Sequence, residues 1–228
     1  MSEYRPPSAF GMIPPVVKNI LIINVICFLA QLNPMMNGWL THNGAAFYFD
    51  SPNFRIWQLF TYAFLHGSST HLFFNMFAVF VFGPPIENYL GSKRFLTYYM
   101  LTAIGAILLQ SIITGYQVYS VAGTFFPIHQ GIVSAQELPY PPVIGASGAV
   151  FGILIAFGML FPNMLLYLYF LFPIKAKYLV IAYGAFELFY AVQNNPNDNV
   201  AHYAHLGGML FGFILLKVWK IRKPGSYY

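Results

Sequence analysis

Two short stretches of the chain place a chemically versatile side chain among small neighbours. Ser147 lies in "VIGASGAVFG" and His205 lies in "AHYAHLGGMLFG". A serine hydroxyl is a weak nucleophile alone and a strong one beside an imidazole that takes its proton. A third stretch, "HLFFN", places His71 and Asn75 four residues apart, on one face of a helix. The chain therefore contains a nucleophile, a base and further polar groups, provided that folding brings them together.

Small residues accompany both Ser147 and His205 at helical spacing. Glycines occur at Gly145, Gly148 and Gly152 in the first stretch and at Gly208 and Gly212 in the second. Glycines on one face of a helix allow a neighbouring helix to approach closely. If the two helices pack along these faces, Ser147 and His205 will lie close together.

Each polar residue also has a structural interpretation. A serine in a Gly- and Ala-rich helix can simply be a packing residue, and Asn75 could hydrogen-bond between helices. His66 and His202 stand where histidines often mark an interface. The soluble-hydrolase motif G-x-S-x-G is not met, because position 149 is alanine. The co-occurrence of serine, histidine and asparagine in three apolar segments favours the functional interpretation.

Composition places the chain in a membrane. Of its 228 residues, 58% are hydrophobic and 7% are charged, and the mean hydropathy is +0.60. Soluble domains carry about 25% charged residues, so this chain cannot cover a surface that faces water. The single cysteine, Cys27, excludes an intramolecular disulfide.

Apolar runs of about 20 residues can cross the bilayer as helices. Six such segments are expected, at about 14–32, 66–86, 95–115, 143–161, 176–192 and 200–219. Between the fourth and fifth, "MLLYLYFLFPIKAK" is interpreted as a short connection along the interface. We find no cleavable signal peptide, and no internal repeat of the kind that many transporters contain.

Charge predicts the orientation of these segments. With six spans, ten of the eleven Lys and Arg residues fall on one face, and only Arg55 falls opposite. Basic residues concentrate on the cytoplasmic side, so both termini are expected there. The net charge of +5 is therefore an orientation signal and not a nucleic-acid-binding surface. Short tails and the lack of a transit peptide favour a bacterial plasma membrane.

Three motifs in order resemble the rhomboid family of intramembrane serine proteases. They are H-x-x-x-N in "WQLFTYAFLHGSSTHLFFN", G-x-S-G in "GASG" and A-H-x-x-G-x-x-x-G in "AHLGGMLFG". The resemblance implies an all-α membrane protein, a six-transmembrane helical bundle over residues 14–220. Residues 1–13 and 221–228 would be short cytoplasmic segments.

The resemblance also implies roles for individual residues. Ser147 would be the nucleophile and His205 its general base. The side chains of His71 and Asn75, with the Ser147 backbone N–H, would stabilise the oxyanion. The substrates would be single-pass transmembrane proteins, cleaved near the outer interface, and no metal or organic cofactor is implied. The resemblance sets no oligomeric state.

This chain differs from the family pattern in its outer loops. Many relatives carry a Trp-Arg pair in the first loop, whereas here Gln58 follows Trp57 and Arg55 precedes it. The third loop, about 116–142, is long compared with that of compact bacterial members.

The acidic residues have no assigned chemistry. No carboxylate lies near either motif along the chain, so we expect a Ser–His dyad without a third member. Glu187, inside the fifth segment, is assigned no role. Glu87, in "PPIENYLG", is interpreted as a partner of Arg94 or a backbone cap, and the preceding Pro84-Pro85 is expected to kink or end its helix.

Two other functions remain alternatives. The first is a catalytically silent rhomboid-like scaffold or chaperone, but such proteins typically lack the serine or the histidine, and both are present. The second is a small transporter in which His71, Asn75, His205 and Glu187 form an ion or proton path. The absence of a repeat and the glycine beside Ser147 count against it.

Overall fold

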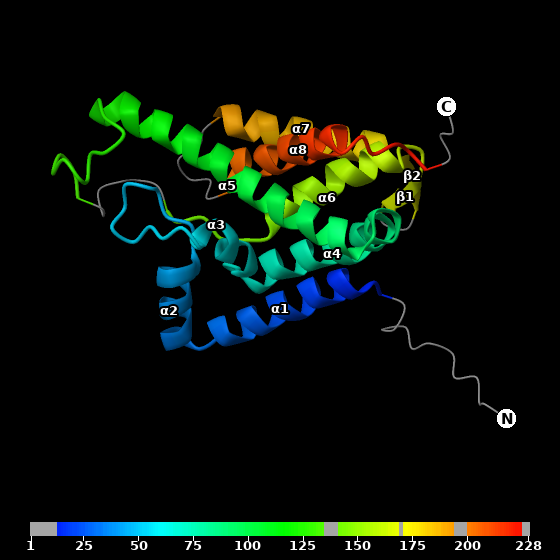
Figure 1. Cartoon of the computed structure of the whole chain (residues 1–228), viewed down its shortest axis with the longest axis horizontal. Helices are drawn as coiled ribbons and strands as arrows, with labels where there is room; N and C mark the ends of the chain where they lie inside the picture. Colours follow the sequence, from blue (N-terminus) through cyan, green and yellow to red (C-terminus); the bar gives the residue numbers. More distant parts are fainter. Residues whose placement is uncertain (1–12, 135–140, 169–170, 194–199, 225–228) are drawn as a thin grey trace.

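The protein is a helical bundle with one small β-hairpin (Figure 1), as a computed structural model of residues 13–134, 141–168, 171–193 and 200–224 shows. The elements are α1 (Pro15–Gln31), α2 (Pro34–Gly44), α3 (Gln58–Thr61), a 3-10 helix (Tyr62–Phe64), α4 (Ser69–Leu90), α5 (Ser92–Ala122), α6 (Ser147–Leu160), β1 (Leu165–Leu168), β2 (Phe172–Lys175), α7 (Ala176–Gln193) and α8 (His202–Val218).

Each of the six expected segments contains one helix: α1, α4, α5, α6, α7 and α8. Among the described residues, α4 and α5 are long and apolar enough by themselves to cross a membrane, while α1, α6 and α8 are shorter apolar helices. Helix α5 has 31 residues and is therefore about 46 Å long, more than the roughly 30 Å hydrocarbon core. The third loop was expected to begin at about residue 116, but α5 continues to Ala122, so the loop begins later than expected.

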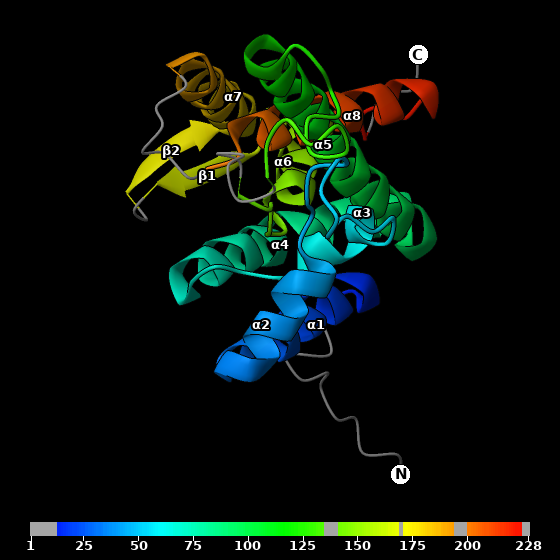
Figure 2. The same ribbon diagram turned by 90° about the vertical axis from the view of Figure 1, so that its left-hand side faces the viewer.

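Helix α6 lies in the middle of the bundle. Figure 2 shows it among α4, α5, α7 and α8, and it contacts all four. Eleven of its fourteen residues are buried, so both sides of this helix face protein. Ser147 is therefore the first residue of a helix whose following turns are buried among four others.

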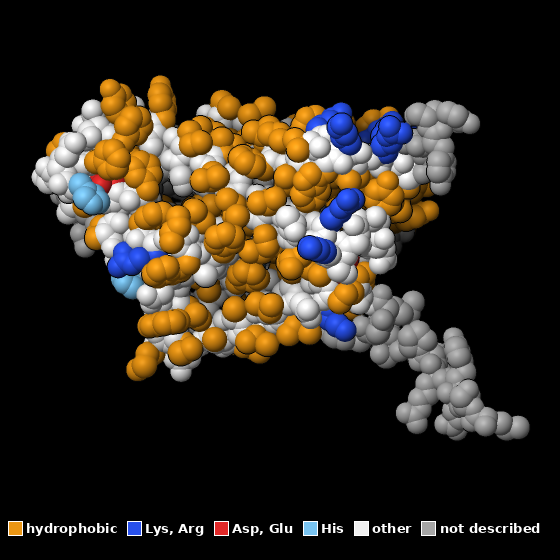
Figure 3. Space-filling model, in the orientation of Figure 1, with side chains coloured by type: hydrophobic (Ala, Val, Ile, Leu, Met, Phe, Trp, Pro, Cys, Tyr) orange, Lys and Arg blue, Asp and Glu red, His pale blue; other side chains and the backbone are white. Residues whose placement is uncertain are grey.

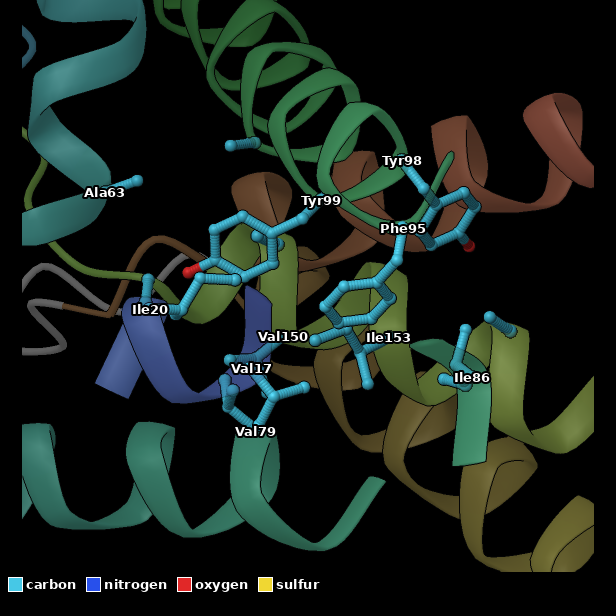
Figure 4. Close-up of a cluster of buried hydrophobic side chains, with 14 of the residues drawn as sticks. Val17, Ile20, Ala63, Val79, Ile86, Phe95, Tyr98, Tyr99, Val150 and Ile153 are labelled. Carbon is cyan, nitrogen blue, oxygen red and sulfur yellow. The ribbon is translucent and has the colours of Figure 1, made fainter. Parts of the chain in front are cut away.

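The core beside α6 is built largely from one face of α5. Phe95, Tyr98 and Tyr99 lie three and four residues apart, so they share a helix face, and all are fully buried (Figure 4). Two tyrosine hydroxyls lock neighbouring elements: Tyr98 donates to the Gly152 carbonyl at 2.8 Å, and Tyr62 donates to the Ala103 carbonyl at 2.6 Å. These bonds connect α5 to α6 and to the 3-10 helix that contains Tyr62.

Glu87 joins α4 to the start of α1. Its carboxylate accepts the backbone N–H groups of Val16 and Val17, at 3.0 and 2.8 Å, and the Ser92 hydroxyl at 2.7 Å. The expected backbone cap is therefore observed, and the helix it caps is α1. Helix α4 runs to Leu90 with Pro84 and Pro85 inside it, so the prolines do not end the helix, and the alternative, a kink, stays a prediction.

The Glu87→Ala variant should lower the thermal unfolding midpoint in detergent without changing the chemistry of the distant Ser147. Hydrogen bonds to a charged group contribute about 1.5–3 kcal/mol each, and Glu87 accepts three of them and is 1% exposed, so we expect unfolding to cost at least about 4 kcal/mol less in the variant. The midpoint of Glu87→Gln, which keeps one acceptor oxygen, should lie between those of wild type and Glu87→Ala. An unchanged midpoint for Glu87→Ala would show that the cap contributes nothing.

Two local predictions need correction. The fourth segment becomes helical only at Ser147, because Val143 instead pairs in an antiparallel bridge with Ala46, and Gly145 has φ +125°. The connection after α6 forms the β1–β2 hairpin, so the fold is not purely α, while its place along the membrane interface stays a prediction. Aromatic and β-branched residues such as Tyr167 and Ile174 favour strands, and Pro173 is tolerated because both strands are edges.

The altered first loop is organised by Gln58. This amide is fully buried, accepts the Arg55 backbone N–H at 3.1 Å and donates to the Asn53 carbonyl at 2.9 Å. Trp57 donates its indole N–H to the Asn43 carbonyl at 2.9 Å. Gln58, the residue after Trp57, therefore holds the loop through backbone contacts.

Basic side chains gather at the end of the molecule where α1 begins and α8 ends (Figure 3). Lys18, Lys93 and Lys177 lie in the first turns of α1, α5 and α7, and Lys217 lies in the last turn of α8. Alternate helices run in opposite directions, so these positions share one end of the bundle. The charge asymmetry expected from the sequence is a feature of the fold.

Candidate active site

Ser147 is presented at a helix start. The chain approaches it through the bridge at Val143 and the left-handed Gly145, whose N–H donates to the Tyr62 carbonyl at 2.9 Å. The first backbone N–H of α6 with an acceptor in this turn is that of Val150, bonded to the Ala146 carbonyl. The N–H groups of the preceding residues, Ser147 included, have no acceptor one turn back and lie at the positive end of the helix dipole.

The Ser147 hydroxyl is hydrogen-bonded to His205. The Ser147 Oγ and His205 Nε2 atoms are 2.8 Å apart, and His205 is only 8% exposed. This is the distance at which an imidazole can accept the hydroxyl proton. The sequence expectation that these two residues lie close together is therefore what the structure shows.

Two glycines make this contact possible. A Cβ atom at Gly208 would lie 1.9 Å from the carbonyl oxygen of Gly148, so the backbones of α6 and α8 touch where they cross. Gly148 follows Ser147 directly, and Gly208 lies three residues after His205. The close crossing of the two helices thus brings the reactive side chains within hydrogen-bond distance.

Phe151 fixes the plane of the His205 ring. The two rings are stacked, with centroids 4.4 Å apart and an interplanar angle of 13°. Phe151 lies four residues after Ser147, one helical turn along the same face. Its spacing of four residues from Ser147 is the signal in the sequence that could have identified it as a neighbour of the site.

A carboxylate from α7 also reaches His205, which the sequence analysis did not expect. Glu187 Oε2 lies 2.8 Å from His205 Nδ1 and 2.6 Å from His202 Nδ1. The contact with His202 has hydrogen-bond geometry. The contact with His205 has the distance of an ion pair, but His205 Nδ1 has no partner in hydrogen-bond geometry. No local pattern links Glu187 to His205, because the two residues are on different helices.

His71 borders the same space as the serine hydroxyl. A Cβ atom at Gly145 would lie 2.8 Å from His71 Nε2 and 3.7 Å from Ser147 Oγ, so only glycine leaves room for the imidazole here. His66 packs edge-on against the His71 ring, with centroids 5.0 Å apart.

Asn75 lies one turn further along α4. It is 6% exposed, and its Nδ2 has no hydrogen-bond partner among the described residues. A buried amide donor without an acceptor is costly, and such groups occur where a ligand or intermediate supplies the acceptor. The four residues expected from the sequence thus lie on three helices, with Ser147, His205 and His71 around one point and Asn75 one turn further along α4.

Glu187, His202 and His205 also form a potential cation site. Their ligand atoms all lie within 4.8 Å of one another, and two histidines with a glutamate are ligands that zinc accepts. A cation bound there would withdraw electron density from the His205 imidazole and weaken its Nε2 as a base. Metal binding and base chemistry at this cluster would therefore compete.

Comparisons with known proteins identify the family of the chain. The chain matches the rhomboid domain model over residues 53–220. It is 30% identical over 216 residues to YdcA of Bacillus subtilis, whose name assigns it provisionally to the rhomboid proteases, and the match covers 93% of this chain and 92% of YdcA.

Two further relatives match over parts of their length. The rhomboid protease GluP of Bacillus subtilis is 31% identical over 171 residues, which are 75% of this chain and 27% of GluP. The rhomboid protease GlpG of Haemophilus influenzae is 28% identical over 123 residues, which are 52% of this chain and 58% of GlpG. Because the domain match spans most of the chain and the match to YdcA extends along nearly all of it, the chain belongs to the rhomboid family.

Proposed function

We propose that this protein is an intramembrane serine endopeptidase that hydrolyses transmembrane substrates near the outer face of the membrane. The observation that carries the proposal is the 2.8 Å hydrogen bond between Ser147 Oγ and His205 Nε2, with the imidazole held flat against Phe151. Relatives named as rhomboid proteases support the same class of activity.

The geometry supports a two-stage acyl transfer. In the first stage, Ser147 Oγ attacks the scissile carbonyl carbon while its proton passes to His205 Nε2. The protonated His205 then gives this proton to the leaving amine as the peptide bond breaks, and an ester on Ser147 remains. In the second stage, a water molecule loses a proton to His205 and attacks the ester, and the proton returns to Ser147 Oγ as the acid product leaves.

Three groups could donate hydrogen bonds to the oxyanion. The Ser147 N–H stands at the start of α6, His71 is packed against Gly145, and the Asn75 amide is buried without an acceptor. In a site of low dielectric constant, removal of one such donor costs about 2.7–4 kcal/mol of transition-state stabilisation. Stabilisation of the transition state would offset the energetic cost of burying these polar groups.

The placement of the site within the bundle supports cleavage near the outer face. His205 is the fourth residue of α8, and Lys217 lies in the last turn of the same helix, about 18 Å away along the axis. If the basic end is cytoplasmic, the reactive groups lie nearer the outer side, where water for deacylation is available. In this proposal all six helices cross the bilayer within residues 14–220, and the segments 1–13 and 221–228 are cytoplasmic. The nearly end-to-end match to YdcA supports a bacterial plasma membrane.

The proposal is tested by labelling and cleavage in detergent. A fluorophosphonate probe should label wild-type protein at Ser147, as located by peptide mapping, and wild type should cleave a single-pass substrate. The Ser147→Ala variant, which has the same fold, should do neither. Cleavage by Ser147→Ala equal to that of wild type would refute the assignment. A folded wild type that is neither labelled nor active would favour the silent scaffold or the transporter.

A further inference from the structure

Glu187 is the acidic residue whose contacts the fold does not explain. Of the acids in the described part of the chain, Asp50 and Glu87 both bind backbone. Asp50 accepts the Ile128 N–H at 2.7 Å and also contacts the exposed imidazole of His129, and Glu87 caps α1. Glu187 instead has two imidazoles as partners, and one of them belongs to the residue that is hydrogen-bonded to Ser147.

The two ring nitrogens of His205 contact two different residues. Nε2 is 2.8 Å from the Ser147 hydroxyl, and Nδ1 is 2.8 Å from Glu187 Oε2. A neutral imidazole carries one proton, on either nitrogen. For Nε2 to accept the serine proton, the ring proton must be on Nδ1, which is the nitrogen that faces the carboxylate. An acceptor at this place favours the tautomer that can act as a base.

The same carboxylate would act again during the reaction. When His205 takes the serine proton, the ring becomes a cation, and a negative charge beside Nδ1 stabilises it without itself being protonated. The side chains of His205 and Glu187 are only 10% and 13% exposed, so water screens this attraction weakly.

His202 holds the carboxylate in place. Its Nδ1 is hydrogen-bonded to Glu187 Oε2 at 2.6 Å, and its ring stacks on Tyr190 with centroids 5.4 Å apart. His202 precedes His205 by three residues, so both imidazoles project from one face of α8 toward α7. A modest rotation of the carboxylate or of the His205 ring would align the Nδ1–H, and catalytic hydrogen bonds often tighten in this way when substrate binds.

We infer that Glu187 is a positioning residue for His205. It selects the Nδ1–H tautomer and stabilises the imidazolium, so that Ser147, His205 and Glu187 work as a triad whose acid comes from α7. The inference rests on the proposed serine endopeptidase function, and it replaces the expectation of a dyad without a third member.

The test compares Glu187→Gln and Glu187→Asp with wild type in the presence of a chelator, which keeps metal ions off the cluster. Glu187→Gln keeps the shape but removes the charge. It should lower kcat by about 10²–10⁴-fold, as loss of the acid does in other serine proteases, while KM changes by less than about threefold. Glu187→Asp, which retains the charge, should recover part of the loss. The control Phe186→Leu changes an exposed neighbour on the same helix and should match wild type.

A spectroscopic measurement separates positioning from a merely structural role. With ¹⁵N-labelled histidine, the His205 signals, assigned by comparison with His205→Gln, should show protonation at Nδ1 in wild type. They should show a mixture of tautomers in Glu187→Gln. His202→Gln leaves Glu187 in place but removes its anchor, and it should lower kcat by about tenfold, so the inference stays testable if Glu187→Gln fails to fold.

The outcomes are distinct from those for the proposed function. A wild type that the fluorophosphonate does not label would refute the peptidase itself. An active wild type with Glu187→Gln turnover within about threefold of it would overturn only the triad. Loss of turnover with the Nδ1–H signal unchanged would overturn it too.

Discussion

Replacement of His205 by alanine should reduce kcat for cleavage of a single-pass substrate by about 10⁴–10⁶-fold, as loss of the base does in other serine proteases. The imidazole is the only base within hydrogen-bond distance of Ser147 Oγ among the described residues. Without it, the serine proton has no acceptor and the leaving amine has no donor. Fluorophosphonate labelling should fall in parallel, because the same proton transfer activates the serine toward the probe.

The matched control for this variant is His42→Ala. His42 lies exposed on α2, far along the chain from the site, so its loss should leave kcat and the thermal midpoint unchanged. If His205→Ala kept the labelling rate of wild type and the same midpoint, the Ser147–His205 contact would be packing and not chemistry.

The Gly208→Ala variant should also lose most of its activity, although it adds a single methyl group. The new Cβ would lie 1.9 Å from the Gly148 carbonyl oxygen, a backbone atom that cannot move without α6. The two helices must therefore separate by more than about 1 Å, and a misplacement of this size costs at least about 10²-fold in rate. Overpacking of this kind also destabilises by about 1–3 kcal/mol, so the thermal midpoint should fall.

Gly38→Ala is the control for Gly208→Ala. Gly38 lies within α2, and a Cβ there meets no atom within 4 Å. Because alanine favours the helix over glycine by about 1 kcal/mol, this variant should equal or slightly exceed wild type in stability. Wild-type turnover by Gly208→Ala would show that the α6–α8 crossing can relax, and it would contradict a site that depends on contact between the two backbones.

Features set by local spacing could be predicted from the sequence. Ser147, His205 and their glycines repeat at intervals of three and four residues, so they mark helix faces that can approach closely. Apolar segment length located the six main helices, and the positions of Lys and Arg predicted which of their ends would lie together. Glu87 was expected to cap a backbone or pair with Arg94, and capping is observed because its neighbour in the fold is the start of α1.

Features that depend on how separate elements meet were decided only by the tertiary structure. The start of α6 at Ser147 requires the pairing of Val143 with Ala46, which are far apart in sequence. The role of the buried Gln58 depends on the loop that folds over it and supplies the Asn53 carbonyl as an acceptor. Glu187 shows the distinction most clearly, since along the chain it is one acid in an apolar segment. Its carboxylate reaches His205 only because α7 packs beside α8 at one particular rotation about its axis, and that rotation is set by side-chain packing along both helices and not by any local pattern.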